Sequence, residues 1–321
     1  TLQLITLSLF AQGPNNTGTY YQSANGLKGK ALKTAMFKII RNHSQLSYDG
    51  LWTAFSTTDK REDGKVWDMY SDKTNYVFGS SAQGANYRKE GDSYNREHSF
   101  PKSWFNDAKP MYTDLVHLVP TDGYVNNRRS NYPFGENNGE KYKSNKGFSK
   151  LGKCTYPGYS GIVFEPNDMY KGDFARIYFY MATAYEDKIA NWSGSEFPKI
   201  ASHDSYKPYK DWQMNMLIEW AKKDPVSQKE IDRNRGIQQQ QNNRNPFVDY
   251  PGLEEYIWGS MQNVAFSYDN YQGVSSIPFI EFETEPIYPK GWYNLNGQKV
   301  GDECPTQKGI YIHHGKKMVI E

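Results

Sequence analysis

The sequence contains few cysteines: Cys154 and Cys304 are the two among 321 residues. Two cysteines are too few for a disulfide framework, and they lack the close spacing of a zinc site. Because they fall in what we expect to be separate domains, we do not expect a disulfide between them. A chain of this length can instead bury a substantial core.

Long apolar runs are also missing: no stretch of about 18 apolar residues occurs, so no membrane-spanning helix is predicted. The short apolar run Leu4–Ala11 is followed by Gln12, Gly13 and Pro14. We interpret residues 1–12 as the remnant of a secretory signal peptide, and a buried first strand is the alternative. This interpretation predicts a secreted or cell-surface protein, with the periplasm as the other exported location.

A strong overall charge is absent, since the formal net charge is +2. Any binding to nucleic acid must therefore depend on a local basic surface. Residues 126–153 offer one, with seven basic side chains against two acidic ones. An ordinary solvated polar loop is the competing interpretation. The basic residues of this segment are Arg128, Arg129, Lys141, Lys143, Lys146, Lys150 and Lys153.

Aromatic side chains are abundant, at 16% of the sequence against 37% hydrophobic residues overall. The core must therefore be built largely from Tyr, Trp and Phe. The same excess leaves rings available to stack on nucleobases or on sugars. Composition does not distinguish these two ligands, and it excludes neither a nuclease nor a glycan-binding protein.

One stretch, Tyr94–Phe105, places a carboxylate beside an imidazole at Glu97 and His98. Such a pair supplies an oxygen ligand for a divalent cation and a proton acceptor near neutral pH. Two such residues often meet by chance, so the pair needs partners from elsewhere in the chain.

A second informative stretch follows. Leu115–Val119 predicts a strand that Pro120 ends, and Asp122 is a good N-cap for a helix that continues to Ser130. This order of strand, loop, strand and helix can bring Asn126 to the side chains of the earlier strand.

Most of the remaining chain shows helical periodicity, so we predict an α+β fold with a mainly helical domain over residues 13–262. Asp173 and Arg176 are expected to form an ion pair within one helix, and Asp249 to act as a cap or ion-pair partner. A strand is expected at Asn75–Phe78. The predicted helices lie within Leu27–Ser44, from Lys171, within Pro208–Lys223, within Val226–Gln240 and up to Trp258.

The end of the chain differs in composition. Residues 263–289 are predicted to be a linker, because they are rich in Ser, Gly, Pro and Glu and have no helical period. Residues 290–321 alternate short β-like runs with turns at Asn296–Gly297 and His314–Gly315, which predicts a small all-β module. Truncation near residue 265 is therefore expected to preserve any activity of the helical domain.

Four motifs, in this order, carry a family resemblance: EHSFPKSWF, DLVHLVPTDGYVNNRRSN, KGDFARIYFYMATAYED and NRNPFVDYP. Together they resemble the bacterial endonuclease I family, which comprises secreted or periplasmic nucleases of the His-Me finger (ββα-metal) superfamily. The C-terminal YNLNGQKV and KGIYIHHGKKMVIE resemble the secretion-sorting modules of exported Bacteroidetes proteins.

The resemblance implies a role for each matching residue. His98 would be the general base, Glu97 and Asn126 would hold one Mg²⁺, and Ca²⁺ or Mn²⁺ are alternatives. The family often has an Arg after the E-H-x-x-P motif that stabilises the phosphate, but residues 103–113 offer only Lys109. The nucleic-acid-binding candidates are therefore Arg96, Arg128 and Arg129. Arg129 matches the Arg of the family's N-x-x-R-S-N run, which implies either a phosphate contact or a scaffold role.

These features predict a monomeric, secreted endonuclease without strong sequence specificity, acting on DNA, RNA or both. Its C-terminal module would engage secretion machinery. One alternative is a secreted glycan-binding or glycan-cleaving protein, although no aromatic-flanked carboxylate pair stands out. The other is a nuclease-fold protein that binds nucleic acid without cleaving it.

Overall fold

A computed structural model describes the chain in four stretches, and two compact units emerge, Thr1–Val274 and Ser275–Glu321. The predicted signal remnant, most of the predicted linker and both predicted C-terminal turns lie outside the described stretches. The described residues are 13–273, 291–294, 298–313 and 316–320.

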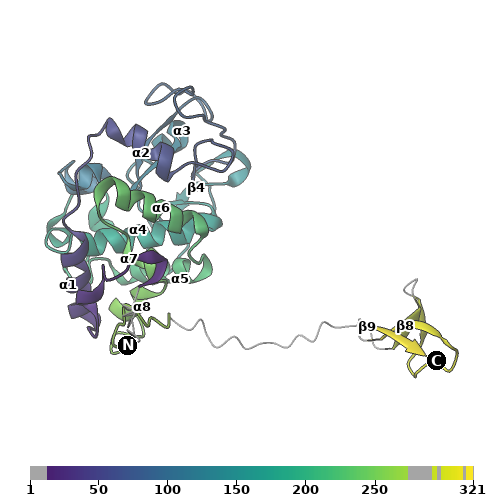
Figure 1. Cartoon of the computed structure of the whole chain (residues 1–321). Coiled ribbons are helices and arrows are strands. Elements are labelled where there is room, and N and C mark those ends of the chain that lie inside the picture. The colour runs from purple at the N-terminus through teal and green to yellow at the C-terminus, as the bar shows by residue number, and fades with distance from the viewer. Residues whose placement is uncertain (1–12, 274–290, 295–297, 314–315, 321) are drawn as a thin grey trace, which may run out of the picture. The chain divides into compact units, whose positions relative to one another are not determined.

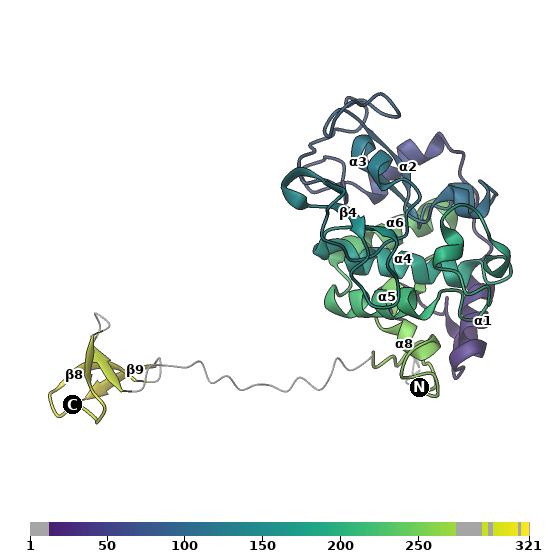
Figure 2. The same ribbon diagram turned by 180° about the vertical axis from the view of Figure 1, so that it is seen from behind.

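The main unit is built around α4, which packs against α1 and α5 (Figures 1 and 2). Every residue of α4 after its first is buried, because aromatic and small side chains alternate around the helix. The predicted α+β class is confirmed, and the expected helices are present with shifted ends. They are α1 (Gly29–Ile40), α2 (Gly50–Thr58), α4 (Lys171–Ala184), α5 (Asp211–Lys223), α6 (Gln228–Gln241), α7 (Pro246–Asp249) and α8 (Leu253–Ile257).

At one end of this unit, strands β1 (Tyr94–His98) and β2 (Leu118–Asp122) pair antiparallel, and α3 (Gly123–Arg129) follows β2 directly. The predicted strand at Leu115–Val119 is displaced by three residues, since Pro120 lies inside β2. A two-stranded sheet tolerates this proline because each strand has an unpaired edge. The predicted N-cap is present, with the Asp122 carboxylate accepting from the Val125 N–H at 2.8 Å.

A second sheet carries part of the basic segment and has the order β3-β4-β5. The predicted strand at Asn75–Phe78 is wrong, because this segment forms a single bridge between Lys65 and Val77. The strands of this sheet are β3 (Tyr142–Lys143), β4 (Lys150–Lys153) and β5 (Ile162–Glu165).

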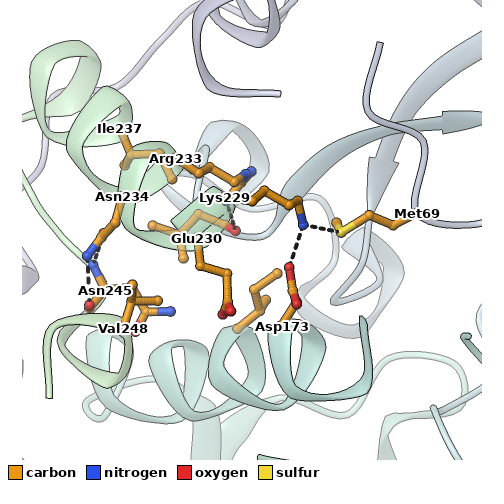
Figure 3. Close-up of a pocket in the computed structure, with 11 residues that line it drawn as sticks. Met69, Asp173, Lys229, Glu230, Arg233, Asn234, Ile237, Asn245 and Val248 are labelled. Atoms are coloured by element: carbon orange, nitrogen blue, oxygen red, sulfur yellow. Dashed lines mark hydrogen bonds and ion pairs between the residues drawn. The ribbon is translucent and has the colours of Figure 1, made fainter. Parts of the chain in front are cut away.

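The ion pair predicted within α4 is also wrong. Asp173 pairs instead with Lys229 of α6, and Arg176 pairs with Glu230 at 2.6 Å. All four side chains are nearly buried, so these ion pairs join α4 to α6 inside the protein and are not surface pairs. Figure 3 shows Lys229 reaching across to Asp173 and Met69.

The packed part of the main unit extends beyond residue 262, where the linker was predicted to begin. Phe266 and Tyr268 are buried, and the Phe266 ring meets the Tyr250 ring at 4.8 Å. Residues 263–273 therefore belong to the packed unit. Their mostly polar composition predicted a linker, although a few aromatic side chains anchor them to the core.

The smaller unit is a four-stranded sheet of order β7-β6-β8-β9, which confirms the small all-β module. Its strands are β6 (Trp292–Asn294), β7 (Lys299–Gly301), β8 (Gly309–His313) and β9 (Lys316–Ile320). Both Cys154 and Cys304 are free thiols. Within the described stretches, no helix combines the length and apolar character needed to cross a membrane.

Candidate active site

His98 ends β1 and is held by one backbone contact. Its Nε2 lies 3.0 Å from the Tyr112 carbonyl oxygen. A carbonyl can only accept, so Nε2 carries the proton in this contact and the lone pair of the neutral ring is on Nδ1. The backbone therefore selects the tautomer in which Nδ1 can accept a proton.

The imidazole is also kept neutral. Burial, and next the neighbouring His117, lower the pKa of His98 well below its usual value. His98 is 5% exposed, and its ring lies against both Tyr48 and Tyr112. A neutral, oriented imidazole of this kind can act as a general base.

Glu97 is 4% exposed and makes strong contacts through one oxygen. Its Oε1 accepts from the Tyr70 hydroxyl at 2.8 Å and pairs with Arg129 Nη1 at 3.0 Å. Burial raises the pKa of Glu97 to about 7, although Arg129, Tyr70 and Asn126 each lower it. The carboxylate therefore lacks full compensation for its charge, which is a feature of sites that bind a cation.

Asn126 reaches the same carboxylate from α3, since its side chain lowers the pKa of Glu97. Its Nδ2 donates to Asn95 Oδ1 at 2.7 Å, which fixes which way the amide points. No hydrogen bond to Asn126 Oδ1 is found among the described residues. The strand–helix unit therefore places Asn126 of α3 close to Glu97 of β1, and His98 is the next residue along β1.

This donor set fits a magnesium ion. One carboxylate and one amide oxygen are hard ligands, and Mg²⁺ commonly takes few protein ligands and retains several waters. Within the described part of the chain, no cluster of three or more His, Cys, Asp or Glu side chains could hold a metal. The arrangement therefore does not suit Zn²⁺, which needs three or four such ligands.

Arg129 does not reach a surface where nucleic acid could bind, contrary to its place among the nucleic-acid-binding candidates. It is 1% exposed and donates to the carbonyls of His98 and Ser99, at 3.1 and 2.6 Å, besides pairing with Glu97. Arg129 therefore holds the Glu97 carboxylate and the backbone after His98 in place from inside the protein.

Of the other two candidate arginines, Arg128 is exposed and the Arg96 side chain is 15% exposed. Arg96 lies over the rings of Tyr48 and Trp52, with its Cζ 3.5 and 4.5 Å from their centroids. Arg128 is exposed, 4.7 Å from the centroid of Tyr124. Arg96 and His98 are two residues apart on β1, so they lie on the same face of the strand.

The predicted basic surface is partly present. Lys141, Lys143, Lys146 and Lys153 are exposed, whereas Lys150 pairs with the buried Glu165 at 3.3 Å. These exposed lysines extend the positive charge of Arg128 along the segment that follows α3.

The cluster in Figure 3 is not a second substrate site. It encloses a cavity of about 20 Å³, which is room for a single water molecule. Its charged groups satisfy one another, so its role is to join helices. Asp249 is similarly structural, because it is buried and pairs with Arg244 at 2.5 Å, as expected of an ion-pair partner.

The sequence interpretation missed the residues that support the site. Asn95 could have been found, because it precedes Glu97 by two residues on β1 and so shares its face. Tyr70 and Tyr48 gave no local signal, since they arrive from loops distant in sequence.

Comparison with known proteins places this strand–helix site in context. A family model described as Endonuclease I matches residues 28–252. An extracellular ribonuclease of Bacillus amyloliquefaciens is 37% identical over 252 residues, covering 76% of this chain and 79% of the relative. One of Bacillus subtilis is 36% identical, covering 80% and 84%. A periplasmic deoxyribonuclease of Aeromonas hydrophila is 29% identical over 142 residues, covering 43% and 48%.

The fold and the site define a ββα unit whose first strand carries a carboxylate and an imidazole in succession and whose helix carries an amide. The match covers most of the main unit and includes every residue of this site. The chain belongs to the endonuclease I family.

Proposed function

We propose that this protein is a secreted, metal-dependent endonuclease that hydrolyses phosphodiester bonds of RNA and DNA without strong sequence specificity. The observation that carries the proposal is the oriented, neutral His98, which directly follows the buried Glu97 on β1. The names of the relatives support both substrates and an exported location, since they include extracellular ribonucleases and a periplasmic deoxyribonuclease.

His98 would remove a proton from the attacking water through Nδ1, while Nε2 stays bonded to the Tyr112 carbonyl. Glu97 and Asn126 would hold Mg²⁺, with Mn²⁺ or Ca²⁺ as substitutes. A bound cation would stabilise charge on the phosphoryl oxygens and on the leaving 3′-oxygen. Arg129 and Tyr70 would keep the Glu97 carboxylate in place.

Arg96 is the best candidate for the protein cation that contacts the phosphate. Arg129 is buried, whereas Arg96 shares a strand face with His98 and is held between two rings. Arg128 and the exposed lysines after α3 would contact phosphates further along the strand. Such contacts carry no base information, which fits a non-specific enzyme.

We assign the described residues 13–273 to a catalytic unit that acts as a monomer, and residues 290–321 to a sorting module for the secretion machinery. This division follows the two compact units and the C-terminal resemblance.

The direct test is digestion of single-stranded RNA and plasmid DNA by purified protein with Mg²⁺, Mn²⁺, Ca²⁺ or EDTA. We expect cleavage with Mg²⁺ or Mn²⁺ and none with EDTA, restored when Mg²⁺ is added back. A folded, metal-supplied protein that binds both nucleic acids but leaves them intact would support the non-catalytic alternative instead.

A further inference from the structure

A continuous row of rings and cations borders His98. We call it the aromatic ladder and define it by five residues: Tyr48, Trp52, Arg96, Lys102 and Tyr112. Lys102 Nζ lies 5.6 Å from the Tyr112 centroid, and the Tyr112 and Tyr48 centroids are 4.8 Å apart. Arg96 then covers Tyr48 at 3.5 Å and Trp52 at 4.5 Å.

The ladder touches the proposed general base directly. The His98 ring lies 5.3 Å from Tyr112 and 6.2 Å from Tyr48, nearly parallel to Tyr48 with an interplanar angle of 20°. A phosphate placed for attack at His98 would therefore have its neighbouring nucleotide beside these two rings.

Two rings of the ladder, Tyr48 and Tyr112, are only partly buried in the core. However, Arg96 covers the Tyr48 ring at 3.5 Å and Tyr112 packs against it at 4.8 Å. Trp52, by contrast, packs edge-on against Phe55 and Tyr94 and anchors the ladder to the core. Tyr112, whose neighbour on the outer side is the exposed Lys102, is therefore the ring of the ladder that a ligand can reach.

The cations of the ladder also retain unused donors. Arg96 donates through Nη1 to the Tyr48 carbonyl and to Asp49, but its Nε and Nη2 have no partner among the described residues. Lys102 is half-exposed and pairs only with the exposed Asp107 in the described structure, at 2.8 Å. A row that contains both rings and cations can bind bases through its rings and phosphates through its cations.

We infer that the aromatic ladder is a base-binding subsite that makes the enzyme prefer single-stranded nucleic acid. This inference rests on the proposed function and adds to it the form of the substrate. A base next to the scissile phosphate stacks on Tyr112, which Tyr48 supports from behind, while Arg96 and Lys102 hold the adjoining phosphates. Bases inside a duplex are already stacked and paired, so they cannot reach these rings.

The test measures binding without cleavage, so that it does not depend on catalysis. A labelled single-stranded oligonucleotide, the same strand with one abasic position, and the duplex are titrated with the protein in EDTA. We expect the wild-type protein to bind the intact single strand about tenfold or more tightly than the other two.

Substitutions then locate the subsite. Tyr112→Leu and Tyr48→Leu should each weaken binding of the intact strand about tenfold, whereas Tyr112→Phe should retain it because the ring remains. The affinity for the single strand that has its abasic position at the subsite should not change in Tyr112→Leu, because that strand has no base to stack there. Tyr156→Leu is the matched control, because Tyr156 is a half-buried tyrosine bonded to Glu219 outside the ladder.

Equal wild-type affinity for single strand and duplex would overturn the inference, as would equal weakening of all three ligands by Tyr112→Leu in a folded variant. Circular dichroism melting establishes that each variant is folded. If the ladder binds bases as inferred but Mg²⁺ restores no cleavage, the inference stands and the proposed function fails.

Discussion

Glu97 and His98 are consecutive residues whose side chains lie in different surroundings. Glu97 faces Tyr70, Arg129 and Asn126, where burial raises the pKa of its carboxyl group to about 7. His98 faces Tyr48 and Tyr112, where burial lowers the pKa of its imidazole. The alternation of side chains along a strand separates an oxygen site from a proton acceptor within two residues.

The sequence made Glu97, His98 and Asn126 candidates because their side-chain types suit metal binding and proton transfer. It could not predict whether Arg129 meets substrate or backbone, since a guanidinium suits both. The structure decides this through burial, because three oxygen acceptors surround Arg129 inside the protein.

A stability prediction concerns Glu254, whose Oε2 is buried without a partner among the described residues. Burial raises the pKa of Glu254 to about 7, against about 4.3 for an unfolded chain. The native state therefore holds the proton over this window, and the free energy of unfolding falls as pH rises through it. Glu254→Gln should raise the free energy of unfolding at pH 8 by up to about 3 kcal/mol, and change it little at pH 4.

Urea unfolding at pH 8 and at pH 4 measures this effect. The neighbouring Glu255 provides the control. Burial favours its neutral form, but the Lys222 ion pair and the Ser260 N–H outweigh this and lower the pKa of Glu255. Glu255→Gln should therefore destabilise the protein at pH 8. If Glu254→Gln destabilises equally at pH 8, the assigned environment of Glu254 is incorrect.

At the scale of elements, the loop before β2 is tied to α6. Arg233 donates to the carbonyls of Leu115, Val116 and Leu118 and pairs with the buried Asp59 at 2.9 Å. This explains why residues 115–117 are not a strand, although they are apolar. Their backbone acceptors are satisfied by a side chain from far along the chain, which no local pattern reveals.

Arg233→Leu should accordingly destabilise the protein by about 3–5 kcal/mol, because it removes the ion-pair partner of the buried Asp59 and the donors to three carbonyls. Arg235→Leu is the control on the same helix, since Arg235 is exposed and pairs with the exposed Asp232. It should change the free energy of unfolding by less than about 1 kcal/mol. Similar losses from the two variants in chemical denaturation would contradict this account.

At the scale of the whole molecule, sequence predicted the class, the two units and the order of most helices. Periodicity and composition carry that information over long segments. The boundary of the main unit was misplaced because few residues decide it: Phe266 and Tyr268 pack against the core from within a polar stretch.

A truncation series tests that boundary. A chain ending at residue 273 should keep both its stability and its nuclease activity. A chain ending at residue 262 should lose several kcal/mol of stability, since about 1.5–3 kcal/mol accompanies each buried aromatic side chain removed. Thermal melting followed by RNA digestion compares the two. Equal melting temperatures would show that residues 263–273 add no stability and belong to the linker, as first predicted.

The central claim is that His98 takes the proton while Glu97 and Asn126 hold the metal. It is tested by measuring Mn²⁺ binding and the single-turnover cleavage rate of RNA together, in His98→Ala and in Glu97→Gln. We predict that His98→Ala loses about 10²–10⁴ in rate with unchanged metal affinity, whereas Glu97→Gln loses metal affinity. A folded His98→Ala protein that cleaves within tenfold of the wild-type rate would contradict the account.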